Sequence, residues 1–188
     1  MRPALATVLA LIACAKFEVS DSHAEAARQS VTFYGGPATR RYMSEIFFQG
    51  NLSVDGAMLG LAYDRRLADL GSGFTLETEI QMTHFFMGRP YSSVAGGLGL
   101  RYDTSRWTKR PSSFAFYSGP SYADDPALSE GKSGRFLEYV AVEFAVAAGE
   151  EIQWDGVIRM YHRSGAFGLY GLHTDTGSTL GIGIRRRF

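Results

Sequence analysis

Two residues near the C-terminus have types and a spacing suited to nucleophilic chemistry. His162 and Ser164 lie within the stretch MYHRSG (160–165). On a β-strand, residues two apart point to the same side, with their backbones roughly 6–7 Å apart, so the two side chains can lean together. An imidazole beside a serine hydroxyl is one way in which a serine becomes a nucleophile. The pair is either a catalytic site or the polar end of a strand, and the surrounding elements must decide.

Composition restricts the classes of protein. The chain has 188 residues, the length of one domain, and its formal net charge of zero gives no electrostatic case for nucleic acid. The 22 glycines and 13% aromatic residues are a bias common in antiparallel barrels.

The first 26 residues have the features of a signal peptide. Arg2 precedes an apolar run (4–15), and a small-x-small cleavage site ends at Ala26. The sequence around Cys14 also resembles a lipoprotein box, which leaves open whether this cysteine is lipidated. Cleavage after Ala26 leaves a mature domain, 27–188, without cysteine, so disulfides have no part in its stability.

Period-two alternation of apolar and polar residues dominates the mature domain and predicts an all-β fold. No transmembrane helix is expected. The stretch MSEIFFQG (43–50) is assigned to the first long loop. Eight strands are predicted, over residues 30–36, 56–66, 74–86, 93–103, 112–123, 134–147, 152–164 and 178–188.

Two β architectures compete: a soluble sandwich or lipocalin-like barrel, and a transmembrane barrel with its apolar face outward. The strands are long enough for a tilted crossing of the hydrocarbon layer, which needs about 9–11 residues. The final strand alternates and ends at Phe188, which resembles the assembly signal of bacterial outer-membrane barrels. We therefore predict an eight-stranded antiparallel up-and-down transmembrane barrel in the outer membrane. Its lumen is expected to contain charged side chains of both signs, namely Glu77, Glu79, Arg101, Asp155, Arg159, Arg185 and Arg187.

Strand numbering then places the His-x-Ser pair. Odd strands run outward in such a barrel, so strand 152–164 ends at the outer rim. His162 and Ser164 continue its lipid-facing row, whereas Arg163 points into the lumen. His84, also at the outer end of an odd strand, is assigned to the aromatic belt at the membrane interface.

An outer-membrane barrel with His-x-Ser at the outer end of its penultimate strand resembles the lipid A 3-O-deacylase (PagL-type) family of acyl-ester hydrolases. The specific motif is HRSG (162–165). The resemblance implies a site on the outer wall of the barrel, with Ser164 as nucleophile and His162 as general base. The family has asparagine after the serine, where this chain has Gly165, whose backbone N–H would have to hold the oxyanion. It also has a glutamate at the position of Thr176, and Asp175 is the simplest replacement.

Strand geometry offers another acid. Glu138 lies in the lipid-facing row of strand 134–147, which pairs with strand 152–164. A turn centred on AAGEE (147–151) sets Glu138 opposite either His162 or Met160. We therefore expect Glu138 to orient His162 as the third member of a triad.

The leading hypothesis is an esterase that removes an acyl chain from lipid A or lipopolysaccharide in the outer leaflet, without cofactor or metal. The acyl chains would lie along Met160, Val140 and Leu180. The strand ending at Phe188 would engage the barrel assembly machinery, and the sequence leaves open a homodimer. The rival is a non-catalytic barrel with a structural or adhesive role, acting through outer loops 37–55 and 123–134.

Overall fold

The alternating segments form eight strands. These are β1 (Gln29–Thr39), β2 (Gly56–Gly71), β3 (Phe74–Phe86), β4 (Tyr91–Asp103), β5 (Ser112–Ala123), β6 (Phe136–Ala147), β7 (Trp154–Ser164) and β8 (Asp175–Arg187). The structure is a computed structural model that describes residues 28–41, 43–50, 53–105, 107, 110–125, 134–149, 152–165 and 175–188, without the side chains of residues 43, 44, 47, 175 and 176. The predicted signal peptide and Cys14 lie outside these residues.

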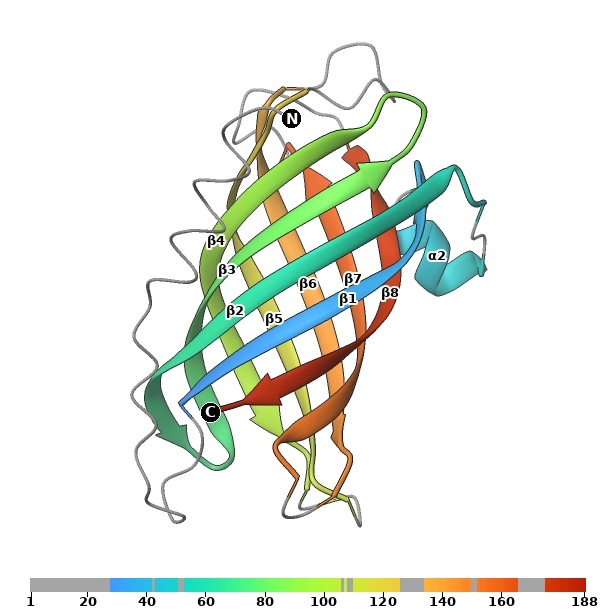
Figure 1. Cartoon of the computed structure of the whole chain (residues 1–188). Coiled ribbons are helices and arrows are strands. Elements are labelled where there is room, and N and C mark those ends of the chain that lie inside the picture. Colours follow the sequence, from blue (N-terminus) through green and yellow to red (C-terminus); the bar gives the residue numbers. More distant parts are fainter. Residues whose placement is uncertain are drawn as a thin grey trace.

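Each strand pairs with its neighbours in sequence, and β1 pairs with β8, which closes the sheet into an antiparallel up-and-down barrel. All eight predicted strands are present, so the predicted fold class is confirmed. Figure 1 shows the C-terminus of β8 at the lower end of the barrel, where β1 begins. As an odd strand, β7 runs from this lower end to the opposite, upper end, where Ser164 lies.

One element differs from the prediction. Residues 43–49, expected to be loop, form a short helix, α2 (Met43–Gln49), in the connection between β1 and β2. A seven-residue helix has about two turns, too few for a helical period to stand out in sequence. Among the described residues, no helix has the length and apolar character to cross a membrane.

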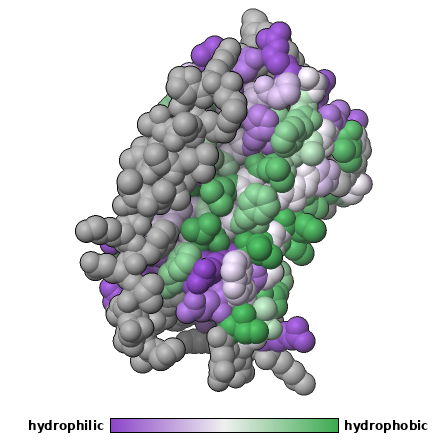
Figure 2. Space-filling model, viewed as in Figure 1, coloured by the Kyte–Doolittle hydropathy of each residue, from purple (hydrophilic) through white to green (hydrophobic). Residues whose placement is uncertain are grey.

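The distribution of side chains between the two faces of the sheet is the reverse of that in a soluble barrel. Ile182 on the outer face is 73% exposed, whereas Arg159 on the inner face is 0% exposed. On the side of the barrel seen in Figure 2, apolar residues gather across the middle and polar residues lie toward both ends. An apolar outer band around a polar interior is the arrangement of a transmembrane barrel, so the soluble alternative is rejected.

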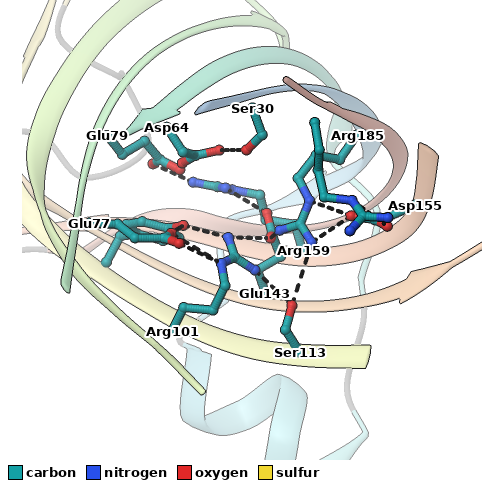
Figure 3. Close-up of polar contacts among 12 residues, drawn as sticks. Ser30, Asp64, Glu77, Glu79, Arg101, Ser113, Glu143, Asp155, Arg159 and Arg185 are labelled. Atoms are coloured by element: carbon teal, nitrogen blue, oxygen red, sulfur yellow. Dashed lines mark hydrogen bonds and ion pairs between the residues drawn. The ribbon is translucent and has the colours of Figure 1, made fainter. Parts of the chain in front are cut away.

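The lumen contains the mixed charges that the sequence predicted, joined as ion pairs with Glu143, a residue that the prediction did not include (Figure 3). Glu143 is the centre: its carboxylate accepts hydrogen bonds from Arg101 at 3.1 Å, Arg159 at 2.9 Å and Arg185 at 2.8 Å. Arg159 also contacts Glu79. Further pairs join Arg101 to Glu77 at 3.0 Å and Arg185 to Asp155 at 2.6 Å. The interior of an eight-stranded barrel is just wide enough for side chains, and here charged groups share it with buried tyrosines such as Tyr34 and Tyr117.

Candidate site on the outer wall

His162 and Ser164 lie on the outward face of β7, at its upper end. The residue between them, Arg163, is 1% exposed, and its Nε donates to the buried Ser121 hydroxyl at 2.9 Å, so it points into the lumen. The predicted orientation of all three residues is therefore present in the structure. A site formed by the pair would be on the wall of the barrel rather than in its interior.

The upper end of β7 differs from the lower end in its exposure. Ile158, on the outward face, is 52% exposed, as expected for a lipid-facing residue. The next two residues on the same face, Met160 and His162, are only 3% and 6% exposed, and Ser164 is half-buried. The imidazole is thus enclosed, while the serine beside it retains contact with the surroundings.

Residues of β8 hold the imidazole. His162 Nδ1 lies 3.0 Å from Ser178 Oγ and 3.1 Å from the carbonyl oxygen of Gly177. Ser178 is directly opposite His162 in the β7–β8 ladder and is 2% exposed. Sequence reasoning missed Ser178, because its place beside the imidazole depends on the register of two strands and on no local motif.

The register between β6 and β7 corrects the prediction for Glu138. Neither predicted partner is right: Glu138 is opposite Ser164, and Val140 is opposite His162. The connection is longer than the predicted tight turn, since regular pairing ends at Ala147 and Asp155. Compared with the predicted pairing of Glu138 with His162, the partner of Glu138 therefore moves by two residues along β7. A shift by an even number of residues keeps each side chain on its predicted face.

The Glu138 side chain is bonded toward β5. Its Oε1 accepts a hydrogen bond of 2.5 Å from the Ser118 hydroxyl, on the side of β6 remote from β7. The carboxylate is therefore next to the serine of the pair in the ladder, but its hydrogen bond to a described residue leads away from the imidazole. Its expected action on His162 remains a prediction.

The other two predicted site residues lie close to Ser164 in the chain or in the ladder. Asp175 pairs with Ser164, after a bulge that follows Arg163, although its side chain lies outside the described residues. Gly165 follows β7 directly and is buried. Both residues are neighbours of Ser164, and these positions do not test the predicted roles of acid and oxyanion donor.

The predicted acyl-chain residues form one patch below the pair. Met160 is directly opposite Leu180 on β8 and Val142 on β6, and Val140 is opposite His162. Val140 and Leu180 are half-buried. The patch is apolar and neighbours His162 in the ladder, so an aliphatic chain lying on it would bring its polar end to His162 and Ser164.

A second outward histidine forms a comparable contact and serves as an internal comparison. His84 on β3 is opposite Ser92 on β4, with 2.9 Å between Nδ1 and Oγ, and its ring packs edge-on against Phe86. This agrees with its assignment to the aromatic belt. The residue two positions after His84 is Phe86, whereas the residue two positions after His162 is Ser164. Of these two histidines, His162 therefore has a possible nucleophile on the same face of its own strand and His84 does not.

Other candidate sites in the described part of the chain are less suited to catalysis. No cluster of three or more His, Cys, Asp or Glu side chains there could hold a metal ion. A cavity of about 220 Å³ lies in the lower end of the lumen, lined by residues such as Arg28, Asp64 and Arg187. It is at the opposite end of the barrel from Ser164 and belongs to the ion-paired interior.

No protein-family model and no curated protein matches this chain. Among solved structures, the crystal structure of Ail, the attachment invasion locus protein of Yersinia pestis, aligns with a TM-score of 0.52 and 9% identity, covering 87% of this chain and 100% of that one. Ail in a phospholipid bilayer nanodisc gives a TM-score of 0.49 and 12% identity, with 86% and 99% coverage. The outer membrane protein OprG of Pseudomonas aeruginosa gives a TM-score of 0.41 and 11% identity, with 87% and 97% coverage.

The fold and the apolar exterior together define the class: the protein is an eight-stranded outer-membrane β-barrel. The outer-membrane location predicted from the sequence is confirmed at this level. At a sequence identity of about one residue in ten, the similarity supports a shared fold and no shared activity. The resemblance to the lipid A deacylases continues to depend on the motif His162–Gly165.

Proposed function

We propose that this barrel is a serine-dependent esterase that removes an acyl chain from a lipid A-like glycolipid of the outer leaflet. The observation that carries the proposal is the position of His162 and Ser164 together on the outward face, at the outer end of β7. A lipid substrate can reach this wall without leaving the leaflet. Ser164 is half-buried rather than enclosed, and the buried imidazole is held by hydrogen bonds from β8.

In the proposed reaction, Ser164 Oγ attacks the ester carbonyl carbon while His162 takes the hydroxyl proton through Nε2. The tetrahedral intermediate collapses, the sugar oxygen leaves with the proton from His162, and the acyl group remains on Ser164. Water then attacks the acyl-serine and loses a proton to His162. Collapse of this second tetrahedral intermediate breaks the bond between the acyl carbon and Ser164 Oγ, and His162 returns the proton to Oγ. The products are the deacylated glycolipid and a fatty acid, Ser164 is regenerated, and the reaction requires no cofactor.

Three supporting roles are proposed for residues around the pair. The backbone N–H of Gly165 is the candidate donor to the oxyanion, in the place where the deacylases have an asparagine side chain. The acyl chain would lie on the patch of Met160, Val140 and Leu180. The acidic third member proposed from the sequence is Glu138 or Asp175, both of which lie opposite Ser164 in the ladders.

The experiment is mass spectrometry of lipid A from Gram-negative cells that express the wild-type protein or Ser164→Ala. We expect the wild type to release one acyl chain, and Ser164→Ala to lose at least about 10³-fold of the activity, because the nucleophile is gone. Ser92→Ala is the matched control, since it removes the serine of the other outward His–Ser contact and should retain full activity. Surface exposure and heat-modifiable gel mobility would establish that each protein is folded.

One observation favours the non-catalytic alternative. The His84–Ser92 contact has nearly the same length as that of His162 with Ser178, in a place where no nucleophile follows. An outward His–Ser contact at the rim can therefore serve structure alone. Unchanged lipid A in cells with the folded wild-type protein at the surface would support a structural or adhesive barrel.

A further inference from the structure

We infer that Ser178 and the carbonyl of Gly177 are positioning partners of His162. This inference depends on the proposed function, because orienting the imidazole matters for catalysis only if His162 is the base. It assigns a role to two residues of β8 outside the motif HRSG. Neither touches the reacting atoms in the proposed reaction, so both act through the imidazole.

The two contacts on Nδ1 decide which ring nitrogen carries the proton. The Gly177 carbonyl oxygen can only accept a hydrogen bond, and it lies 3.1 Å from Nδ1. Donation from Nδ1 to this carbonyl places the proton of the neutral ring on Nδ1 and the lone pair on Nε2. This is the tautomer that a general base needs for a serine on its other side.

The same geometry excludes Ser178 as the nucleophile. An Nδ1 that donates cannot also take a proton from a serine, so the Ser178 hydroxyl, 3.0 Å away, accepts from the ring. At 2% exposure Ser178 is also closed to a lipid substrate, whereas Ser164 is half-buried. The two serines around the imidazole thus have different functions.

The Gly177 carbonyl is directed at the ring by a local irregularity of β8. Gly177 has φ of +109°, in a region that L side chains rarely adopt, next to the bulge that follows Arg163 in the β7–β8 ladder. A Cβ at this position would overlap the carbonyl oxygen of Thr39 on β1. Position 177 therefore requires a glycine, because only a residue without Cβ lets β8 approach β1 while the carbonyl of residue 177 lies beside the imidazole.

The hydrogen bond of Glu138 with Ser118 and that of His162 with Ser178 lead to different strands. The carboxylate accepts from Ser118 on β5, whereas the imidazole is bonded to β8, so the two groups are held by opposite neighbours.

The test is ¹⁵N NMR of the full-length protein labelled at histidine and refolded in detergent micelles, with His162 assigned through a His162→Gln variant. At a pH where the ring is neutral, wild type should show the proton on Nδ1. Ser178→Ala should add a population with the proton on Nε2, and lower the maximal deacylation rate about fivefold with little change in KM, as expected from loss of one neutral hydrogen bond. Ser92→Ala should change only the His84 signals.

The outcomes separate this inference from the proposed function. A wild-type His162 that carries its proton on Nε2 overturns the role of Ser178 and Gly177 whatever the activity. An unchanged tautomer and full activity in Ser178→Ala would also overturn the role of Ser178. Full deacylation by Ser164→Ala would instead refute the proposed function, while the tautomer of His162 would still report on the β8 contacts.

Discussion

At the residue scale, the environment of His162 distinguishes it from an ordinary interfacial histidine. Its ring is buried on a face that elsewhere meets lipid, and it is bonded from β8. A buried imidazole needs its polar atoms satisfied, and β8 supplies this with a hydroxyl and a carbonyl. His84 has one comparable contact but more exposure, so burial and the neighbouring Ser164 set His162 apart.

Glu138 gives a sharp prediction at this scale. Because its carboxylate bonds to Ser118 on β5, Glu138→Gln should keep that hydrogen bond and retain wild-type deacylation within about threefold. The measurement is the initial rate on lipid A vesicles. A loss of a hundredfold or more would instead make Glu138 the acid of a triad. Ser118→Ala is the companion variant, since it frees the carboxylate without removing it.

At the element scale, the faces of the strands could be predicted and their register could not. Alternation placed His162, Ser164 and Arg163 on their correct sides, because period two follows directly from strand geometry. The partner of Glu138 depended on the length of the β6–β7 connection, and two residues of difference changed it. The position of Ser178 beside His162 has the same origin, and α2 is too short to show a period.

The bulge in β8 supports a prediction about stability. Gly177→Ala combines an unfavourable φ with overlap at the Thr39 carbonyl, so it should lower the free energy of unfolding by about 2–4 kcal/mol. Gly71→Ala is the matched control: φ there is +79° and nothing lies within 4 Å of the added Cβ, so its cost should be about 1 kcal/mol. Urea unfolding in lipid vesicles, followed by tryptophan fluorescence, would measure both. Equal effects would show that the approach of β8 to β1 adds no constraint.

At the scale of the whole molecule, a network of ion pairs lies inside the lumen, beside a cluster of buried apolar residues that includes Tyr34, Tyr117 and Tyr139. Glu143 joins three arginines from β4, β7 and β8, all of them largely buried. Composition gave no sign of this arrangement, since a net charge of zero fits many distributions of charge. The alternation of charged and apolar residues did place Arg101, Arg159 and Arg185 in the lumen, but it did not identify Glu143 as their shared partner.

Removal of the central carboxylate tests this account. Glu143→Ala leaves three buried guanidinium groups without their shared partner, so we expect a loss of about 3–5 kcal/mol in the free energy of unfolding. Asp125→Ala is the control, since it breaks the exposed 3.5 Å pair with Arg89 and should cost less than 1 kcal/mol. Urea unfolding in vesicles measures both variants. A small effect for Glu143→Ala would mean that water solvates the lumen.

The ion pairs of the lumen also bear on how the barrel is assembled. Arg159 and Glu79 are 80 residues apart in the chain and come from β7 and β3, on different sides of the interior. They meet only when the sheet has curled far enough for its two edges, β1 and β8, to approach each other. An open sheet in the bilayer would expose these charges to hydrocarbon, at high cost. Insertion and closure should therefore occur as one concerted step, with the interior charges neutralised as the last seam forms.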